Sequence, residues 1–273
     1  MPEVKEVSFF TNAQSTALDW EKFAQQHFTS ASADLAWGKA TPQYMMCPNS
    51  PYYIKATMPH VKLIAILREP VSRAYSHYQM AVRRNTENRS FDDAVAQQIE
   101  RKALSEARRL RDPVSAIAQE RDYYVVSGEY GRILRPYFEN FLTAQLLVLF
   151  LEEFSANPFV QIKRIFRFLG VESEFLPPNL GERYHESGGT GLLATIFTLA
   201  RQMPISKPVW RALVPTPFKH WIRNKVGTYR GQIPVKTSPM SEQTRVALSQ
   251  FYREDTLLLK ALVGRSLPWP GYL

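Results

Sequence analysis

The fold of this 273-residue chain is decided by residues 62–78, which read Lys62-Leu63-Ile64-Ala65-Ile66-Leu67-Arg68-Glu69-Pro70-Val71-Ser72-Arg73-Ala74-Tyr75-Ser76-His77-Tyr78. The short, nearly continuous apolar run over 61–67 is typical of a parallel strand that is covered on both faces. Pro70 suits the first turn of a helix, because no N–H is needed there, and we expect this helix to reach about Arg84. The stretch therefore predicts a strand, a tight loop and a helix.

A second unit of the same kind follows at residues 145–170. The apolar run Gln145-Leu146-Leu147-Val148-Leu149-Phe150-Leu151 predicts another strand, and a turn is expected at 155–158. Apolar residues then recur at helical spacing up to Gly170, which is a suitable helix C-cap. Two strand-to-helix units predict an α/β fold in which a parallel sheet is flanked by helices.

Further helices are expected between these units and near the end of the chain. Residues 91–110 are highly charged and predict a helix on the surface, whereas residues 130–141 place aromatic and apolar side chains on one helical face. A last helix is signalled by Ser241 as N-cap and by Gly264 at its end. Between Pro177 and Ser241, prolines interrupt short apolar pieces, which favours irregular covering structure.

The composition favours one soluble, folded domain over residues 1–273, with 45% apolar and 22% charged residues. The net charge of +9 indicates an anionic ligand or partner. Because basic residues are spread along the chain and mixed with acidic ones, a nucleic-acid surface is not expected.

Cys47 is the only cysteine, which excludes an intrachain disulfide and a cysteine metal site. Without a signal-peptide pattern or an apolar run long enough to span a membrane, we expect a cytoplasmic protein.

The junction between the first strand and its helix carries the first candidate site. Arg68 follows the strand at the carboxyl end, where α/β sheets gather ligands, and the next helix directs its first N–H groups to the same place. Ser76, about two turns into that helix, adds a hydroxyl donor to the forked, charged donor of Arg68. This arrangement suits a phosphate. From spacing alone, a surface arginine paired with Glu69 and a serine without a ligand remain equally open.

Residues 62–78 closely resemble the 3′-phosphate-binding motif of the sulfotransferases that use 3′-phosphoadenosine-5′-phosphosulfate (PAPS). The resemblance implies a P-loop-like parallel sheet, with PAPS as the cofactor that donates the sulfuryl group. It also implies that Arg68 and Ser76 hold the 3′-phosphate of PAPS. The acceptor would be a hydroxyl or an amine on a small molecule or a glycan, and no metal is implied.

Two earlier segments extend the resemblance. Lys5-Glu6-Val7-Ser8-Phe9-Phe10 is similar to the Lys-Glu-x-x-Phe-Phe segment of the subfamily that includes heparan sulfate and many bacterial sulfotransferases. There the glutamate is the general base, which implies that Glu6 takes the proton from the acceptor. Residues 38–44 are similar to another family segment, in which the lysine matching Lys39 lies close to the group that is transferred and neutralises developing charge.

One departure from the family pattern concerns the start of the chain. Members normally begin with a strand, a phosphate-binding loop and a helix before the glutamate segment, whereas Met1 lies five residues before Glu6. No later stretch offers a G-x-x-x-x-G-K-[ST] loop. We therefore expect a sulfotransferase domain that is truncated at its N-terminus relative to the family, lacks the first strand and the phosphosulfate loop, and turns over poorly by itself.

Two alternative functions remain open from the sequence. The first is a sulfotransferase-like module that binds adenosine 3′,5′-bisphosphate without catalysis. The second is a P-loop kinase of small molecules, since such kinases share a related sheet. The absence of a Walker lysine, of a convincing carboxylate pair for Mg²⁺ and of a phosphate loop argues against the kinase.

Overall fold

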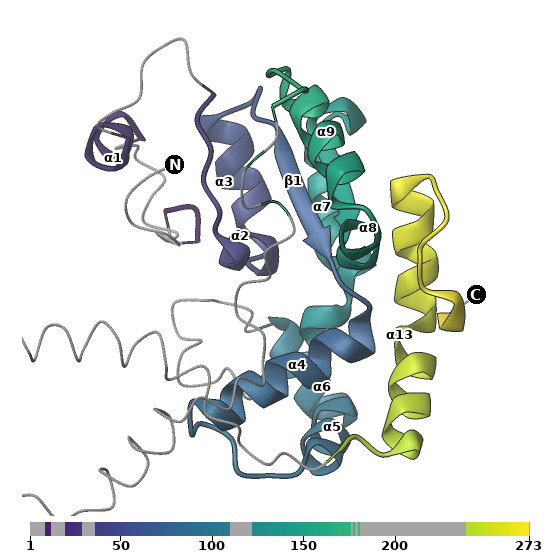
Figure 1. Cartoon of the computed structure of the whole chain (residues 1–273). Helices are drawn as coiled ribbons and strands as arrows, with labels where there is room; N and C mark the ends of the chain where they lie inside the picture. Colours follow the sequence, from purple (N-terminus) through teal and green to yellow (C-terminus); the bar gives the residue numbers. More distant parts are fainter. Residues whose placement is uncertain are drawn as a thin grey trace, which may run out of the picture.

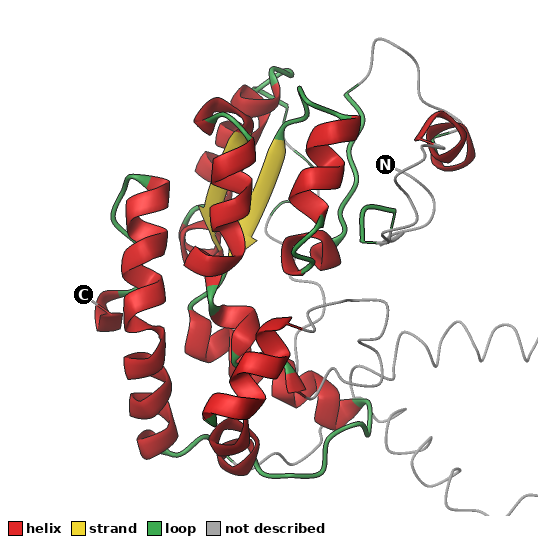
Figure 2. Cartoon of the chain, turned by 180° about the vertical axis from the view of Figure 1, so that it is seen from behind, coloured by secondary structure: helices red, strands yellow, loops and turns green. Residues whose placement is uncertain are grey.

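The computed structural model describes residues 9–11, 20–28, 36–109, 122–175, 177, 180 and 239–272. Two parallel strands lie at the centre of this part of the chain, with helices around them (Figure 2). The strands β1 (Leu63–Leu67) and β2 (Leu146–Phe150) pair in register, so that Leu63 lies opposite Leu146 and Leu67 lies opposite Phe150. The α/β fold with a parallel sheet and flanking helices is confirmed.

The helices of the described residues follow in a simple order along the chain. They are α1 (Trp20–His27), α2 (Pro42–Met46), α3 (Ser50–Thr57), α4 (Pro70–Arg83), α5 (Phe91–Ile99), α6 (Arg101–Arg109), α7 (Tyr130–Asn140), α8 (Leu151–Ala156), α9 (Pro158–Leu169) and α13 (Glu242–Val263), with short 3₁₀ helices η3 (Val126–Gly128), η4 (Thr143–Gln145) and η5 (Pro270–Tyr272). Figures 1 and 2 show α2 and α3 on one side of the strands and α8 and α9 on the other. The helices α4, α5 and α6 gather beyond the carboxyl end of β1.

Local signals set the ends of the long helices as the sequence predicts. The Ser241 hydroxyl accepts a hydrogen bond from the Thr244 N–H at 3.1 Å and begins α13. Gly264 and Gly170 close α13 and α9 with φ of 68° and 77°, the left-handed region that glycine reaches without a Cβ clash. The predicted helix starts and stops at these positions are confirmed.

The helical prediction for residues 91–110 is confirmed over 91–99 and 101–109, but the expected position on the surface is wrong for the first of these two helices. The segment forms α5 and α6, and the break falls at Glu100, whose ψ of 131° leaves the helical region. α5 buries Phe91, Ala94 and Val95 in the main core, because these residues recur at the i, i+3, i+4 spacing of one helical face.

The turn expected at 155–158 is shorter than predicted, since only Asn157 separates α8 from α9. The proline-rich prediction for residues 178–238 falls outside the described residues, except for Leu180.

The packing of α7 against α13 forms the centre of the core. Both Asp255 carboxylate oxygens accept backbone hydrogen bonds at 2.8 Å, from the N–H groups of Gly131 and Arg132 at the start of α7. A Cβ added at Gly131 would lie 2.4 Å from the carbonyl oxygen of Asp255, so this close approach requires glycine. The two helices are therefore joined by both apolar packing and a capping carboxylate.

The two faces of β1 are covered to different extents. Leu63, Ala65 and Leu67 face the main core, whereas Ile64 and Ile66 on the opposite face are 37% and 53% exposed. The prediction of a strand covered on both faces is therefore wrong for β1. Within the described ranges, β2 is the one strand that pairs with β1. An apolar run alone does not reveal whether both faces have neighbours.

Candidate functional site

Arg68 and Glu69 form the tight loop between β1 and α4. The Tyr130 hydroxyl donates to the carbonyl oxygen of Arg68 at 2.9 Å, and the Glu69 N–H donates to Oε1 of Glu152 at 2.8 Å. Tyr130 begins α7, and Glu152 lies in α8, directly beyond the end of β2. The loop backbone is therefore fixed by two elements that are distant in the sequence.

The side chain of Glu69 caps α4. Its Oε1 accepts from the Val71 N–H at 3.0 Å, and its Oε2 accepts from the Ser72 N–H at 2.6 Å. The expectation that these helix N–H groups point at a ligand is wrong, because Glu69 already occupies them. Burial raises the pKa of Glu69, but hydrogen bonds from Ser72, Tyr272 and Val71 outweigh burial and leave the pKa below its ordinary value.

Arg68 and Ser76 belong to the same strand–loop–helix unit, as predicted. Both side chains are half-buried, and within the described part of the chain neither has a hydrogen-bond or ion-pair partner. The alternative in which Arg68 pairs with Glu69 does not occur, since Glu69 caps α4 instead. A half-buried guanidinium without a counter-ion can bind an anion with little competition from the protein.

Lys39 lies in the segment before α2 and is the third predicted site residue that the structure describes. Its Nζ is buried without a hydrogen-bond partner among the described residues and lies 5.1 Å from the ring centroid of Phe23. Burial lowers the pKa of Lys39, since it penalises the charged ammonium. An ammonium in this environment gains from any anion that reaches it.

Phe23, the ring beneath the Lys39 ammonium, belongs to an aromatic cluster with Phe9, Phe10, Trp20 and Tyr44. The ring centroids of Phe9 and Phe23 are 4.5 Å apart, and the Phe9 N–H donates to the Tyr44 hydroxyl oxygen at 3.2 Å. Through Phe23, Lys39 therefore adjoins the cluster that contains the two phenylalanines of the glutamate segment. Glu6 itself lies outside the described residues, so its role as general base stays a prediction.

Helix α7 links the Arg68 loop to this aromatic cluster. Tyr130 at its start donates to the Arg68 carbonyl oxygen, and the hydroxyl of Tyr137, two turns later, donates to the Tyr44 carbonyl oxygen. Both tyrosines are buried. One rigid helix therefore sets the relative position of the two parts of the candidate site, although no contact joins Lys39 to Arg68 or Ser76 among the described residues.

Sequence reasoning did not identify several residues that hold the Arg68 loop. Glu69 was detectable, because an acidic residue directly before Pro70 is a recognised start of a helix. Glu152, Trp269 and Tyr272 carry no comparable signal. Tyr272 donates to Glu69 across 203 positions, and such a pairing depends on the tertiary fold.

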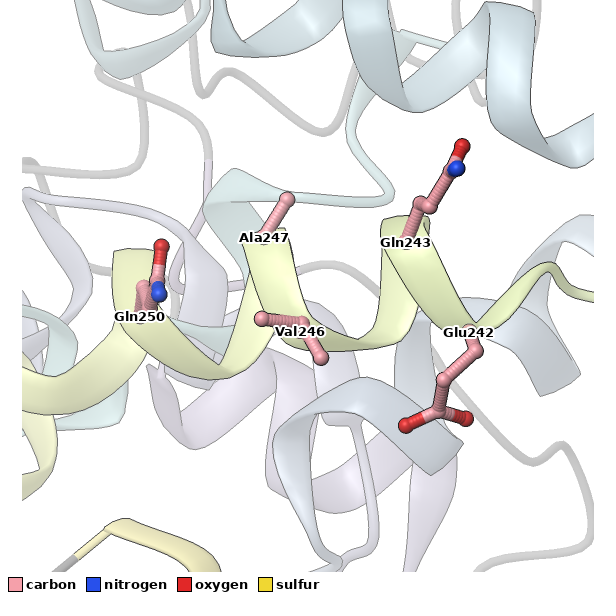
Figure 3. Close-up of a pocket in the computed structure, with 5 residues that line it drawn as sticks. All are labelled: Glu242, Gln243, Val246, Ala247 and Gln250. Carbon is pink, nitrogen blue, oxygen red and sulfur yellow. The ribbon is translucent and has the colours of Figure 1, made fainter.

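The described residues show no other site of comparable quality. They contain no cluster of three or more histidine, cysteine, aspartate or glutamate residues able to hold a metal ion, and none of their helices is long and apolar enough to cross a membrane. Figure 3 shows an open depression on α13, lined by Glu242, Gln243, Val246, Ala247 and Gln250. All five come from one exposed helix face, and none is a predicted site residue.

Comparison with known proteins identifies the family. Residues 3–191 match the sulfotransferase domain family. The chain is 23% identical over 175 residues to heparan sulfate glucosamine 3-O-sulfotransferase 3B1 of Mus musculus, covering 63% of this chain and 40% of that protein. It is 24% identical over 271 residues to bifunctional heparan sulfate N-deacetylase/N-sulfotransferase 4 of Mus musculus, covering 98% of this chain and 27% of that protein. The chain thus spans less than half of the length of these curated relatives.

A solved structure agrees with the fold. A sulfotransferase from Alicyclobacillus acidocaldarius superposes with a TM-score of 0.63 at 21% sequence identity, covering 97% of this chain and 85% of that chain. At this identity the likeness concerns the fold. Together with the family match over residues 3–191, it establishes that the chain belongs to the sulfotransferase domain family.

Proposed function

We propose that this chain binds PAPS and transfers its sulfuryl group to a hydroxyl or amine acceptor. The observation that carries the proposal is the half-buried Arg68 guanidinium, which has no partner among the described residues and follows a parallel strand in a member of the sulfotransferase family. A cation left unpaired beside a helix start suits a phosphate.

The residues that support PAPS as the cofactor are Arg68, Ser76 and Lys39. Arg68 and Ser76 would hold the 3′-phosphate, the first with a forked charged donor and the second with a hydroxyl. Lys39, whose buried Nζ lacks a hydrogen-bond partner among the described residues, would lie nearer the sulfate end. When bound, PAPS supplies an activated sulfuryl group that needs no metal for its transfer.

The chain's own groups would then bind and move protons. Glu6 would accept the proton of the acceptor hydroxyl or amine, a role in which a positioned carboxylate contributes about 10²–10⁴ in rate. Lys39 would hold a positive charge where negative charge develops on the leaving side. The buried ring of Phe23 beside Lys39 would limit the access of water to its ammonium, which would strengthen that interaction.

The acceptor is proposed as a class only. The formal net charge of +9 suits an acidic glycan, and the relatives described above are named as heparan sulfate sulfotransferases. The same positive charge also suits the anionic donor PAPS, so the charge does not choose between acceptors. A small molecule with a hydroxyl or an amine is therefore proposed beside the glycan.

Two assays on the intact chain test the proposal. Calorimetry with adenosine 3′,5′-bisphosphate measures binding, and radiolabelled PAPS with a panel of glycan and small-molecule acceptors measures transfer. Transfer to any acceptor supports the enzyme. Binding without transfer identifies a sulfotransferase-like binding module instead, and the absence of binding rejects both functions.

A further inference from the structure

Two carboxylates flank the loop that carries Arg68. Glu69 is the next residue, and Glu152 accepts a hydrogen bond from the Glu69 N–H at 2.8 Å. Each carboxylate is therefore a potential ion-pair partner of the Arg68 guanidinium, and the attraction is stronger in a half-buried place than in water. Such a pair would neutralise the cation on which phosphate binding depends.

Residues from the C-terminal end of the chain occupy both carboxylates instead. The indole N–H of Trp269 donates to Oε2 of Glu152 at 3.1 Å, and the Tyr272 hydroxyl donates to Oε1 of Glu69. The remaining oxygens accept backbone N–H groups, Oε1 of Glu152 from Glu69 and Oε2 of Glu69 from Ser72. All four carboxylate oxygens thus have a donor other than Arg68.

The two C-terminal donors are firmly placed. Trp269 is 2% exposed and Tyr272 is 4% exposed, and both belong to the main core. The Trp269 ring packs edge-on against Phe150, the last residue of β2, with centroids 5.0 Å apart, and it lies 6.0 Å from the ring of Tyr130. Figure 1 shows this segment returning along α13. The donors are therefore anchored to the strand and the helix that border the loop.

We propose that Trp269 and Tyr272 are positioning residues, which hold Glu152 and Glu69 away from Arg68 so that its guanidinium stays available for an anion. The inference rests on the proposed function, because the anion is the phosphate assigned there to Arg68. It adds a role for the end of the chain, which would control nucleotide affinity without touching the nucleotide.

A rescue experiment separates this role from a general effect on folding. Trp269→Phe removes the N–H donor and keeps an aromatic ring, and calorimetry should show an affinity for adenosine 3′,5′-bisphosphate about three- to tenfold lower, as for the loss of one hydrogen bond. Adding Glu152→Gln should restore the affinity to within about twofold, because a neutral amide does not pair with Arg68. The melting temperature should stay lowered, since the substitution does not restore the lost packing.

Tyr272→Phe is the second variant, which removes one oxygen atom and serves if Trp269→Phe does not fold. Its affinity should fall by a similar factor. Tyr252→Phe is the matched control, because this buried hydroxyl donates to the Val125 carbonyl oxygen at 2.8 Å instead, and its affinity should not change.

The outcomes distinguish a failure of the positioning role from a failure of the proposed phosphate site. If Trp269→Phe and Tyr272→Phe keep full affinity while Arg68→Ala loses it, the positioning role is wrong and the proposed function stands. A loss in Trp269→Phe that Glu152→Gln does not reverse also overturns the positioning role. Full affinity in a folded Arg68→Ala protein overturns the phosphate site itself, and with it this inference.

Discussion

The ammonium of Lys39 lies 5.1 Å from the ring centroid of Phe23, buried and without a hydrogen-bond partner among the described residues. A buried, unpaired charge lowers the stability of a fold, and such a charge is retained where function needs it. Lys39 therefore offers a way to separate the requirements of folding from those of catalysis.

We predict that Lys39→Met raises the urea midpoint of unfolding and lowers sulfuryl transfer, in any preparation that turns over, by about a hundredfold. Stability should rise because an apolar side chain replaces a desolvated ammonium. Lys102→Met on the exposed face of α6 is the control and should change neither quantity. A destabilised Lys39→Met protein would show that the ammonium has a partner in solution.

The pH dependence of stability gives an independent test of Lys39. Burial lowers its pKa from the ordinary value of 10.5, so the unfolded state binds more protons between the lowered pKa and 10.5. Stability should therefore rise with pH through that window, and Lys39→Met should remove this rise. Urea titrations at a series of alkaline pH values measure it, and an identical slope in both proteins would contradict the assignment.

Arg68 and Ser76 should contribute unequally to nucleotide binding. We predict that Arg68→Ala weakens the binding of adenosine 3′,5′-bisphosphate by about ten- to a hundredfold, because a charged hydrogen bond is lost, and that Ser76→Ala has a smaller effect. Arg83→Ala, in the last turn of the same helix, is the matched control and should bind normally. Calorimetry measures the affinity of the three variants for adenosine 3′,5′-bisphosphate, and equal affinities would contradict the assignment.

Gly131→Ala should destabilise the fold by about 1–3 kcal/mol, as expected when a methyl group is forced into a packed core. The new Cβ would lie 2.4 Å from the Asp255 carbonyl oxygen, between α7 and α13. Gly271→Ala is the control, since nothing lies within 4 Å of its added Cβ. Urea denaturation measures both, and equal stabilities would mean that the two helices pack less closely than described.

The ion pair of Glu153 and Arg265 should make stability depend on acid pH. Hydrogen bonds from Arg265 hold the pKa of Glu153 below its ordinary value of 4.5. In one of them, Nη2 of Arg265 lies 3.0 Å from Oε2 of Glu153. The contribution is therefore present above pH 4.5 and is lost as the pH falls through the lowered pKa. Glu153→Gln should cost roughly 1 kcal/mol at pH 7 and less at pH 3. Glu242→Gln, an exposed control on α13, should cost almost nothing at either pH.

The sequence predicts those parts of the fold that depend on neighbouring residues. Both strands and the starts of α4 and α13 follow from apolar runs, from Pro70 and from Ser241, since each signal acts within one turn or one strand. The placement of Arg68 and Ser76 on one strand–loop–helix unit was likewise predictable, whereas their joint role at a phosphate stays a prediction. Residues 91–110 were misjudged because their charges obscure the short apolar face of α5.

The contacts that fix the loop could not be predicted from local patterns. Nothing near Trp269 or Tyr272 indicates a carboxylate partner, and the Glu69 partner of Tyr272 lies 203 positions earlier. The exposure of Ile64 and Ile66 is also a tertiary property, because it depends on which elements lie over β1 and not on the strand itself. Hydrophobic pattern gives the identity of a strand, and long-range packing decides its neighbours.

The contact between Glu69 and Tyr272 also bears on how this protein is made. A ribosome adds residues in order, at about 5–20 per second, so the Arg68 loop leaves the ribosome well before its last hydrogen-bond donor has been synthesised. Glu152 follows Glu69 after 83 positions, and Tyr272 follows it after 203 positions. The loop is therefore completed only after Tyr272 has been synthesised, and prematurely terminated chains that stop before Trp269 would carry the arginine without the groups that hold its surroundings in place.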